Sequence, residues 1–169
     1  MVNLDQTLSQ FKQEVEWVNL REVKEKTTWR MVRDEKPENN SISVDHGVMI
    51  EVLVDGHFGY SGTSDITPEG LRHAFNQAKI IAKVAAKNKV HKFSLEQRPL
   101  AQGSYSSPVA KPLDAISARE ISDIFVDATK AMKISDKVFH RSATAMIVES
   151  YFRSISSSGS DVTQSFSMV

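Results

Sequence analysis

The sequence predicts an α+β fold: a mainly antiparallel sheet with a central β-hairpin, covered by amphipathic helices and followed by a second, smaller helix-plus-strands unit. Two observations carry this prediction. Residues 47–87 hold an apolar strand of period two, a two-residue turn, a glycine-spaced strand and a capped helix. Along the chain, the order helix, strands, helix, linker, helix, strands keeps helices apart from strands, as in α+β proteins.

The predicted hairpin turns at Asp55-Gly56, a dipeptide that suits a type I′ turn because both central positions need a positive φ. This loop sets a register of five pairs: Val54 with His57, Val52 with Gly59, Ile50 with Ser61, Leu53 with Phe58, and Glu51 with Tyr60. One face therefore sets branched aliphatic residues beside small ones. Such a face leaves room for the backbone of another element to approach closely.

Three amphipathic helices are predicted. The first covers residues 5–16, with Leu4, Leu8, Phe11 and Val15 at helical spacing. The second begins at the N-cap Thr67 with Pro68 at its first position, and its buried stripe comprises Leu71, Ala74, Phe75, Ala78, Ile81, Ala82 and Ala85. The third opens with the capping box Ser117-Ala118-Arg119-Glu120, and its buried stripe comprises Ile121, Ile124, Phe125, Ala128 and Met132.

Strand patterns fill most of the remaining chain. Two strands, or one long bent strand, cover residues 18–33, and turn chemistry occupies residues 34–40 before a short strand at 41–45. A further strand covers residues 144–156, followed by a turn at 157–160 and an alternating segment to the end. The pattern stops at Val169 in mid-strand, which fits either a piece of a longer protein or an edge strand at a natural terminus.

Three of the five prolines fall between residues 98 and 112, together with a glycine and three serines. This composition favours a linker or an extended crossing segment. The predicted domains are therefore an N-terminal α+β domain at 1–97, a linker at 98–114, and the start of a further region at 115–169.

Composition excludes several classes of protein. Of the 169 residues, 40% are hydrophobic and 25% charged, as in ordinary globular proteins. The 21 basic and 21 acidic residues balance, which argues against broad binding to a phosphate backbone. The lack of cysteine excludes disulfides and thiolate metal ligands within the chain. Neither a signal peptide nor an apolar run of ~20 residues occurs, so a cytoplasmic location is the default.

The search for chemistry finds no self-contained active site. None of the five histidines, at positions 46, 57, 73, 91 and 140, has a partner at zinc-ligand spacing. The glycines at 56, 59 and 62 are spaced wrongly for a dinucleotide or phosphate loop. The serines at 154–160 lack the G-x-S-x-G pattern and read as a polar turn. We therefore assign no catalytic residue and no metal ligand, and substrate-binding residues stay unknown.

Two further groups are open to a binding role. Trp17 and Trp29 could line a peptide groove, although packing on a sheet face is the favoured interpretation. The carboxylates of Asp34, Glu35 and Glu38 share one segment, and here turn formation is favoured over an acid/base pair.

Specific residues nevertheless resemble those of a known family. They are Gly47-Val48, residues 52–56 with Phe58-Gly59-Tyr60, Thr63-Ser64-Asp65 before Pro68-Glu69, the alanines at 74, 78, 82 and 85, and Ile155-Ser156-Ser157-Ser158-Gly159. Together they resemble the N-terminal domain of the TldD/PmbA family, once labelled modulators of DNA gyrase and understood as zinc-dependent peptidases. The resemblance is sharpest from residue 47 to residue 85.

The resemblance implies a role in processing or degrading small or unfolded peptides in the cytoplasm. In the family an H-E-x-x-x-H helix of a C-terminal domain holds the zinc, and no position here matches that motif. We therefore expect a non-catalytic N-terminal portion with no cofactor of its own, although zinc is implied for the full-length protein. The implied partners are a peptide or unfolded protein and a second family member, in a homo- or heterodimer that encloses a substrate cavity. Neither a nucleic acid nor a membrane is expected as a partner.

An alternative function belongs to the interaction class. The chain would then be a stand-alone module that binds an extended peptide by strand addition, through its sheet and the segment at 98–112. A small-ligand sensor is a third possibility, supported only by the small-residue face of the hairpin.

Overall fold

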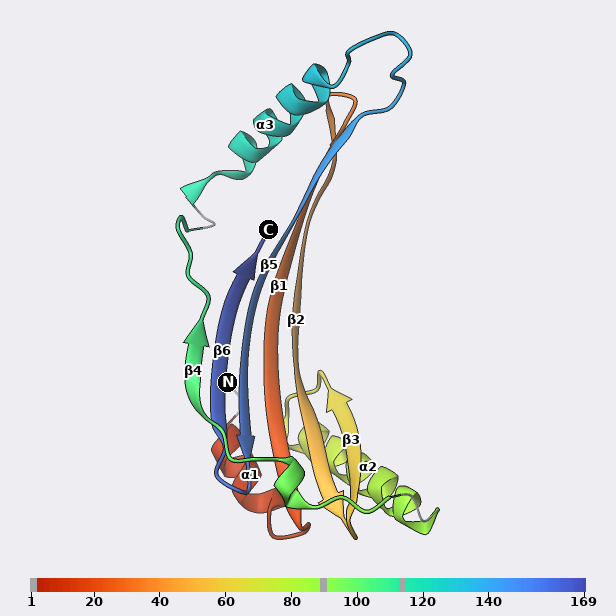
Figure 1. Cartoon of the computed structure of the whole chain (residues 1–169), viewed down its shortest axis with the longest axis vertical. Coiled ribbons are helices and arrows are strands. Elements are labelled where there is room, and N and C mark those ends of the chain that lie inside the picture. Colours follow the sequence, from red (N-terminus) through yellow and green to blue (C-terminus); the bar gives the residue numbers. More distant parts are fainter. Residues whose placement is uncertain (1–2, 89–90, 113–114) are drawn as a thin grey trace. The chain divides into compact units, whose positions relative to one another are not determined.

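The computed structural model describes residues 3–88, 91–112 and 115–169. Its elements are α1 (Leu4–Phe11), β1 (Trp17–Arg33), β2 (Lys36–Val54), β3 (His57–Thr63), α2 (Pro68–Lys87), the 3-10 helix η1 (Leu95–Gln97), β4 (Gln102–Ser106), α3 (Ala118–Ala131), β5 (Ser142–Ser156) and β6 (Asp161–Met168) (Figure 1). The strands form one sheet in the order β3-β2-β1-β5-β6-β4. The predicted α+β class is confirmed, and the strands after α3 join the same sheet as the hairpin.

The chain divides into two compact units, each assembled from separate segments. Unit 1 comprises Met1–Lys24, Asp45–Tyr105 and Tyr151–Ser165, and unit 2 comprises Glu25–Val44, Ser106–Ser150 and Phe166–Val169. Strands β1, β2, β4, β5 and β6 contribute residues to both units. The boundaries expected at 97 and 115 stay a prediction, and residues 113 and 114 of the expected linker lie outside the described residues.

The hairpin of β2 and β3 forms in the predicted register. Asp55 and Gly56 have φ angles of 52° and 72°, as the type I′ turn requires. All five predicted pairs are present, from Val54 with His57 to Ile50 with Ser61. The turn chemistry alone therefore specified which side chains share a face.

Gly59 is the point where α2 meets the hairpin. A Cβ atom at this position would lie 2.0 Å from the backbone oxygen of Ala78 and 2.7 Å from the backbone nitrogen of Ala82. Both alanines are fully buried. Small residues on the strand and on the helix thus let the two backbones come together, as the small-residue face predicted.

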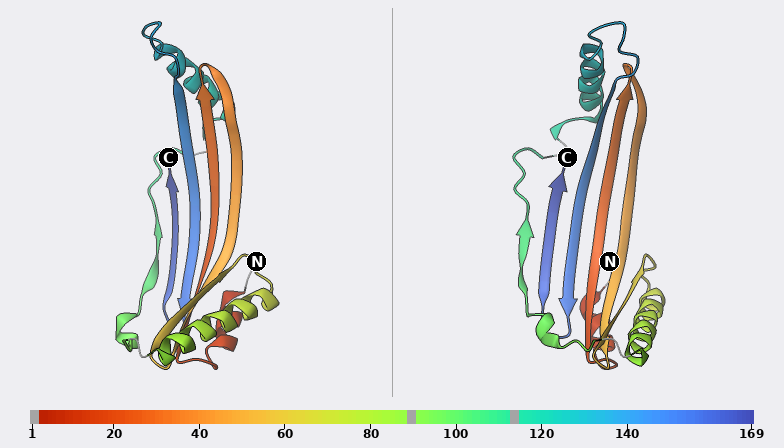
Figure 2. Two further views of the ribbon diagram at one scale, coloured as in Figure 1. Left: turned by 90° about the vertical axis from the view of Figure 1, so that its right-hand side faces the viewer. Right: turned by 45° about the vertical axis from the view of Figure 1, so that its right-hand side comes forward.

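The core of unit 1 lies on one face of its strands, beneath α1 and α2 (Figure 2). The rings of Phe11 on α1 and Phe75 on α2 stack with centroids 4.2 Å apart. The guanidinium of Arg72 lies 4.4 Å from the centroid of Phe11 and donates a hydrogen bond to Glu14. Lys79 also donates to Glu14, at 2.8 Å, and the two donors hold the pKa of that carboxyl below its usual value. A charged cluster therefore closes the edge of the core.

Arg153 on β5 ties α1 to the sheet within unit 1. It donates to Asp5 of α1 at 2.9 Å and to Asp161 of β6 at 2.8 Å. The hydrogen bonds from Arg153 lower the pKa of Asp161. One guanidinium fork therefore holds three elements.

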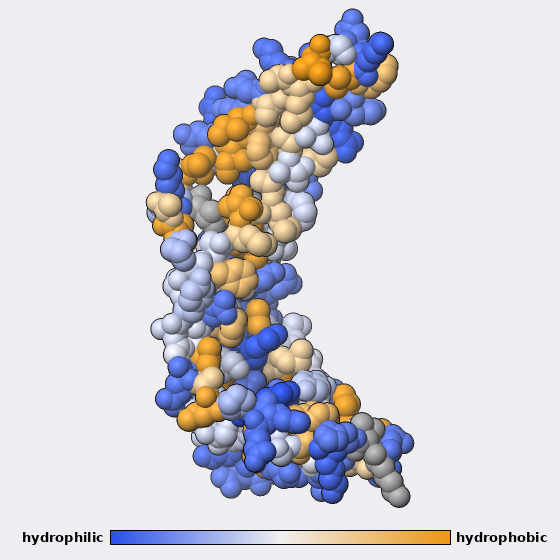
Figure 3. Space-filling model, in the orientation of Figure 1, coloured by the Kyte–Doolittle hydropathy of each residue, from blue (hydrophilic) through white to orange (hydrophobic). Residues whose placement is uncertain are grey.

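In unit 2, α3 begins at the predicted capping box, in which Ser117 and Glu120 satisfy each other's backbone N–H groups. Its predicted buried stripe is wrong in part. Ile124 and Met132 are 57% and 45% exposed, whereas Thr129 is fully buried. The helix packs through the row Ile121, Phe125 and Thr129, so it is rotated away from the expected face. Hydrophobic residues consequently gather along α3 at the surface shown in Figure 3.

Two other element predictions need correction. The first helix ends at Phe11 rather than Glu16, because Glu14 is held by α2 and the N–H of Glu16 bonds to the carbonyl of Leu53 in the hairpin. Ile81 of α2 is 47% exposed, not buried. No helix in the described part of the chain is both long enough and apolar enough to cross a membrane.

The turn predicted at 34–40 contains only Asp34 and Glu35, and β2 runs unbroken from Lys36 to Val54. Both turn residues have positive φ, 48° and 68°. Arg141 donates to the carboxylates of both, which holds this two-residue turn closed. Pro37 fits the strand because residues 36–45 are exposed, as at a sheet edge.

The packing at position 59 makes Gly59→Ala a severe substitution. We expect it to lower the free energy of unfolding by about 3 kcal/mol, because the new methyl group overlaps the backbone of α2. Gly62→Ala, on the same strand, is the matched control: the nearest atom to its Cβ lies 3.9 Å away, and we expect a change within about 0.5 kcal/mol. Urea unfolding measures both, and equal effects would contradict close packing at Gly59.

The Arg153 fork predicts a dependence of stability on pH. The pKa of Asp161 is lowered in the folded state. Its contribution to the free energy of unfolding is therefore fully present above the ordinary carboxyl pKa, and it is lost as the pH falls through the lowered pKa of the folded state. Asp161→Asn should cost about 0.5 kcal/mol at pH 7, since the pair is partly solvent-exposed. Its difference from the wild type should shrink towards pH 3 in urea unfolding. Asp127→Asn, on the exposed side of α3, is the control, and a pH-independent effect at position 161 would refute the assignment.

Candidate functional site

A cavity of about 350 Å³ lies in unit 1 on the face of the sheet opposite the core. Successive side chains of a strand point to opposite faces, so Val18 and Leu20 enter the core while Trp17 and Arg21 reach the other side. We call this cavity the sheet-face pocket. It is lined by Trp17, Asn19, Arg21, Glu51, Arg98, Pro99, Ala101, Phe152, Ser154, Ser156, Ser160 and Val162.

Hydrogen bonds between side chains order the floor of the sheet-face pocket. The indole Nε1 of Trp17 donates to Ser158 Oγ at 3.1 Å, and Ser154 Oγ donates to Asn19 Oδ1 at 3.0 Å. The Ser157 hydroxyl accepts from the backbone N–H of Val18. The serines of this turn therefore serve as structural donors and acceptors, in line with the polar-turn interpretation.

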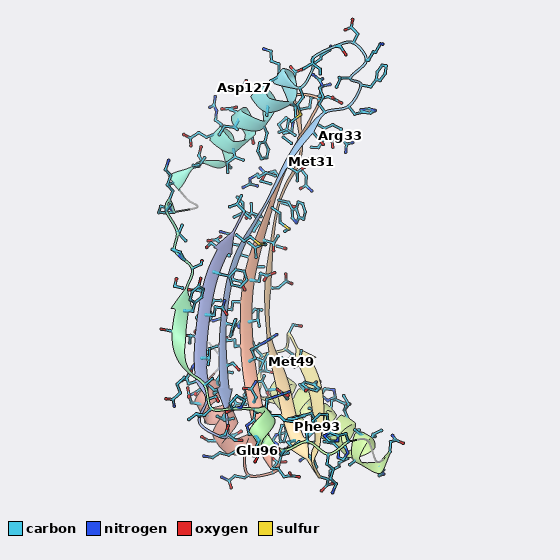
Figure 4. All side chains as sticks on the ribbon, viewed as in Figure 1. Met31, Arg33, Met49, Phe93, Glu96 and Asp127 are labelled. Atoms are coloured by element: carbon cyan, nitrogen blue, oxygen red, sulfur yellow. The ribbon has the colours of Figure 1, made fainter. Side chains whose placement is uncertain are left out.

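Arg98 forms one wall of the pocket. Its Nη2 donates to Glu51 Oε1 at 2.6 Å and to the hydroxyl of Tyr60 at 3.2 Å. The same guanidinium lies 4.5 Å from the centroid of the Phe58 ring. Burial, together with the neighbouring Glu51 carboxylate, raises the pKa of Tyr60. Phe93, labelled in Figure 4, packs on Phe58 with ring centroids 5.4 Å apart. These contacts fasten the chain after α2 across the outer face of the hairpin.

Arg21 offers the charge that the pocket can present to a ligand. It is exposed, and its guanidinium carbon lies 6.0 Å from the centroid of the Phe152 ring. Among the described residues it forms no ion pair. An arginine beside an aromatic ring, with amide and hydroxyl groups around it, can bind a polypeptide through charge, stacking and hydrogen bonds.

The described lining of the sheet-face pocket holds no base placed to activate a hydroxyl nucleophile. No histidine or cysteine lines it, so none of its serines has the adjacent base that activates a hydroxyl nucleophile. Its only carboxylate, Glu51, is engaged by Arg98.

The histidines have structural contacts of their own. His46 Nε2 lies 2.7 Å from Glu22 Oε1, and the buried His57 ring bonds to the carbonyl of Asp55 at 2.8 Å. His140 lies 3.5 Å from Asp34, while His73 is exposed on α2. Over residues 3–88, 91–112 and 115–169, no three histidine or acidic side chains come together as metal ligands. The residues described therefore do not fit a zinc site, and the assignment of no catalytic residue stays a prediction.

The two tryptophans have different environments. Trp17 is buried and lines the sheet-face pocket, whereas Trp29 is 40% exposed in unit 2. Sequence reasoning missed Arg98, because its partners Glu51 and Tyr60 lie 47 and 38 positions away. The hairpin register did pair Glu51 with Tyr60 on the outer face, and that pairing was the one available signal.

Part of the sequence matches a known protein family. The sequence profile of PmbA/TldA metallopeptidase domain 1 matches residues 19–82, which span β1, the hairpin and most of α2. None of the curated proteins matches the sequence.

Several solved structures have the same fold. A candidate modulator of a DNA gyrase from Thermotoga maritima is 15% identical, with a TM-score of 0.73 over 97% of this chain and 36% of its own. TldE from Thermococcus kodakarensis is 16% identical, with a TM-score of 0.70 over 97% and 37%. A candidate gyrase modulator from Bacteroides thetaiotaomicron is 15% identical, with a TM-score of 0.65 over 96% and 38%.

The chain thus spans little more than a third of each of these proteins, and identities this low show the fold alone. The profile match covers the hairpin and most of the helix whose residues carried the resemblance. Over residues 19–82 the chain is similar to the N-terminal domain of the TldD/PmbA family.

Proposed function

We propose that this chain is the non-catalytic N-terminal portion of a TldD/PmbA-like zinc metallopeptidase that processes or degrades small or unfolded peptides in the cytoplasm. The family domain at residues 19–82 is the observation that carries the proposal. In this role the chain contributes to a homo- or heterodimer and to the wall of the substrate cavity, while the zinc and the catalytic groups belong to another part of the enzyme.

The sheet-face pocket supports a role in holding peptide. Its floor is ordered by internal hydrogen bonds, so little conformational entropy is lost when a ligand binds. Arg21 stands exposed at this pocket with no ion pair to any described residue. An extended chain in the pocket would therefore meet a preorganised polar surface and one available positive charge.

A second candidate is the stand-alone peptide-binding module. One observation favours it: β4 is an edge strand of the sheet and every one of its five residues is exposed. Such an edge can pair with an extended peptide. The substitutions Ser104→Pro and Tyr105→Pro test this second candidate. Neighbouring residues of a strand direct their backbone N–H groups to opposite sides, so one of the two substitutions removes a donor from the free edge of β4.

The test of the main proposal uses the 169-residue chain and fluorescein-labelled casein, an unfolded protein. After dialysis against zinc, we expect far less than one equivalent of bound metal and no release of labelled fragments. We expect saturable binding by fluorescence anisotropy, weakened several-fold by Arg21→Ala because its cation is lost from the pocket. Arg119→Ala, which removes an exposed arginine of α3, is the control and should leave the affinity unchanged.

Each opposite result has a defined meaning. One equivalent of zinc per chain, or cleavage of casein, would contradict the non-catalytic assignment. Equal affinity of the Arg21→Ala protein and the wild type would contradict peptide binding at the sheet-face pocket. Weakening by the β4 proline variants, with Arg21→Ala unaffected, would favour the stand-alone module.

A further inference from the structure

Unit 2 contains a half-buried arginine side chain with two unpaired donor atoms. The Nε and Nη1 atoms of Arg30, on β1, are buried and have no hydrogen-bond partner among the described residues. A buried guanidinium that lacks a partner is costly, and such groups normally meet a carboxylate or several carbonyl oxygens. The exception calls for a physical explanation.

Arg30 lines a cavity of about 150 Å³ under the start of α3. We call it the α3 cavity. Lys26, Thr28 and Arg30 are spaced two residues apart on β1, so their side chains share one face of the sheet. The other lining residues are Ile42 of β2, Ile147 and Glu149 of β5, and Ile116, Ala118 and Ile121 from the start of α3.

The other charges of the cavity are already paired with each other. Lys26 Nζ lies 2.9 Å from Glu149 Oε2, and both side chains are about half exposed. Arg30 lies four positions beyond Lys26, about 13 Å along the strand. Glu149 therefore neutralises Lys26 at one end of the cavity, which leaves the charge of Arg30 uncompensated at the other.

The N-terminus of α3 does not account for the cavity. Ser117 and Glu120 form a capping box, so the first backbone donors of the helix are already satisfied. The unpaired donors belong to the guanidinium of Arg30, and four isoleucines line the same cavity.

We propose that the α3 cavity binds the C-terminal carboxylate of a peptide whose last residue is aliphatic. The Nε and Nη1 atoms of Arg30 can each donate a charge-assisted hydrogen bond to a carboxylate, and the isoleucines that line the cavity take the last side chain. A phosphate fits poorly, because it brings a second negative charge and further oxygens that these aliphatic walls cannot satisfy. The choice of a peptide, rather than a free aliphatic acid, rests on the proposed function.

The test measures binding of N-acetyl-Ala-Ala-Val to the whole chain by calorimetry. We expect the free acid to bind at least about tenfold more tightly than its C-terminal amide, since only the acid supplies the carboxylate. Arg30→Met should abolish this preference. Arg33→Met is the control, because Arg33 (labelled in Figure 4) lies on the same strand and pairs with Glu38 at 3.3 Å. In a ¹⁵N spectrum the Arg30 Nε–H resonance should shift on addition of the acid.

A second measurement guards against misfolded variants. Because Arg30 Nε and Nη1 have no partner to lose, Arg30→Met without peptide should melt at the same temperature as the wild type or higher. A lower melting temperature, with Arg33→Met unchanged, would show that Arg30 already stabilises the free protein, and would overturn the proposal.

The remaining outcomes are equally decisive. Equal affinity for acid and amide, or for the wild type and Arg30→Met, would overturn the proposal. If isovalerate bound as tightly as the peptide, the ligand would be a small aliphatic acid and not a peptide. If inorganic phosphate bound as tightly, the cavity would be a phosphate site and not a carboxylate site. The zinc and casein measurements do not depend on any of these results, so they test the proposed function independently.

Discussion

The close approach of α2 to the hairpin at Gly59 is the constraint on which unit 1 depends. The backbone of α2 at the buried residues Ala78 and Ala82 occupies the space that a side chain at position 59 would need. This contact places Phe75 against Phe11 and thereby positions α1 as well. A single missing Cβ atom thus determines the depth of the core on one face of the strands.

The core on one face leaves the other face of the strands available for ligands. Residues of β1 alternate between the two, so Val18 and Leu20 stabilise the fold while Trp17 and Asn19 build the sheet-face pocket. The pocket is ordered by serine hydroxyls and by the contact of Arg98 with Glu51. Neighbouring residues of the same strands therefore build the core on one face and the polar sheet-face pocket on the other.

Unit 2 is covered less completely. α3 packs through one narrow row and leaves Ile124 and Met132 exposed, and the α3 cavity beneath its start holds the unpaired guanidinium of Arg30. Buried donor atoms without a partner are costly for the free protein. A carboxylate ligand would remove that cost, which links the incomplete packing of unit 2 to the binding proposed there.

The sequence by itself determined the features that depend on neighbours along the chain. The Asp55-Gly56 turn, the register of the hairpin and the caps at Thr67 and Ser117 all follow from local backbone preferences. Only the tertiary structure decided the sheet order, the rotation of α3, and the meeting of Arg98 with Glu51 or of Arg153 with Asp5. These contacts join residues far apart in the chain, and no local preference of either partner specifies them.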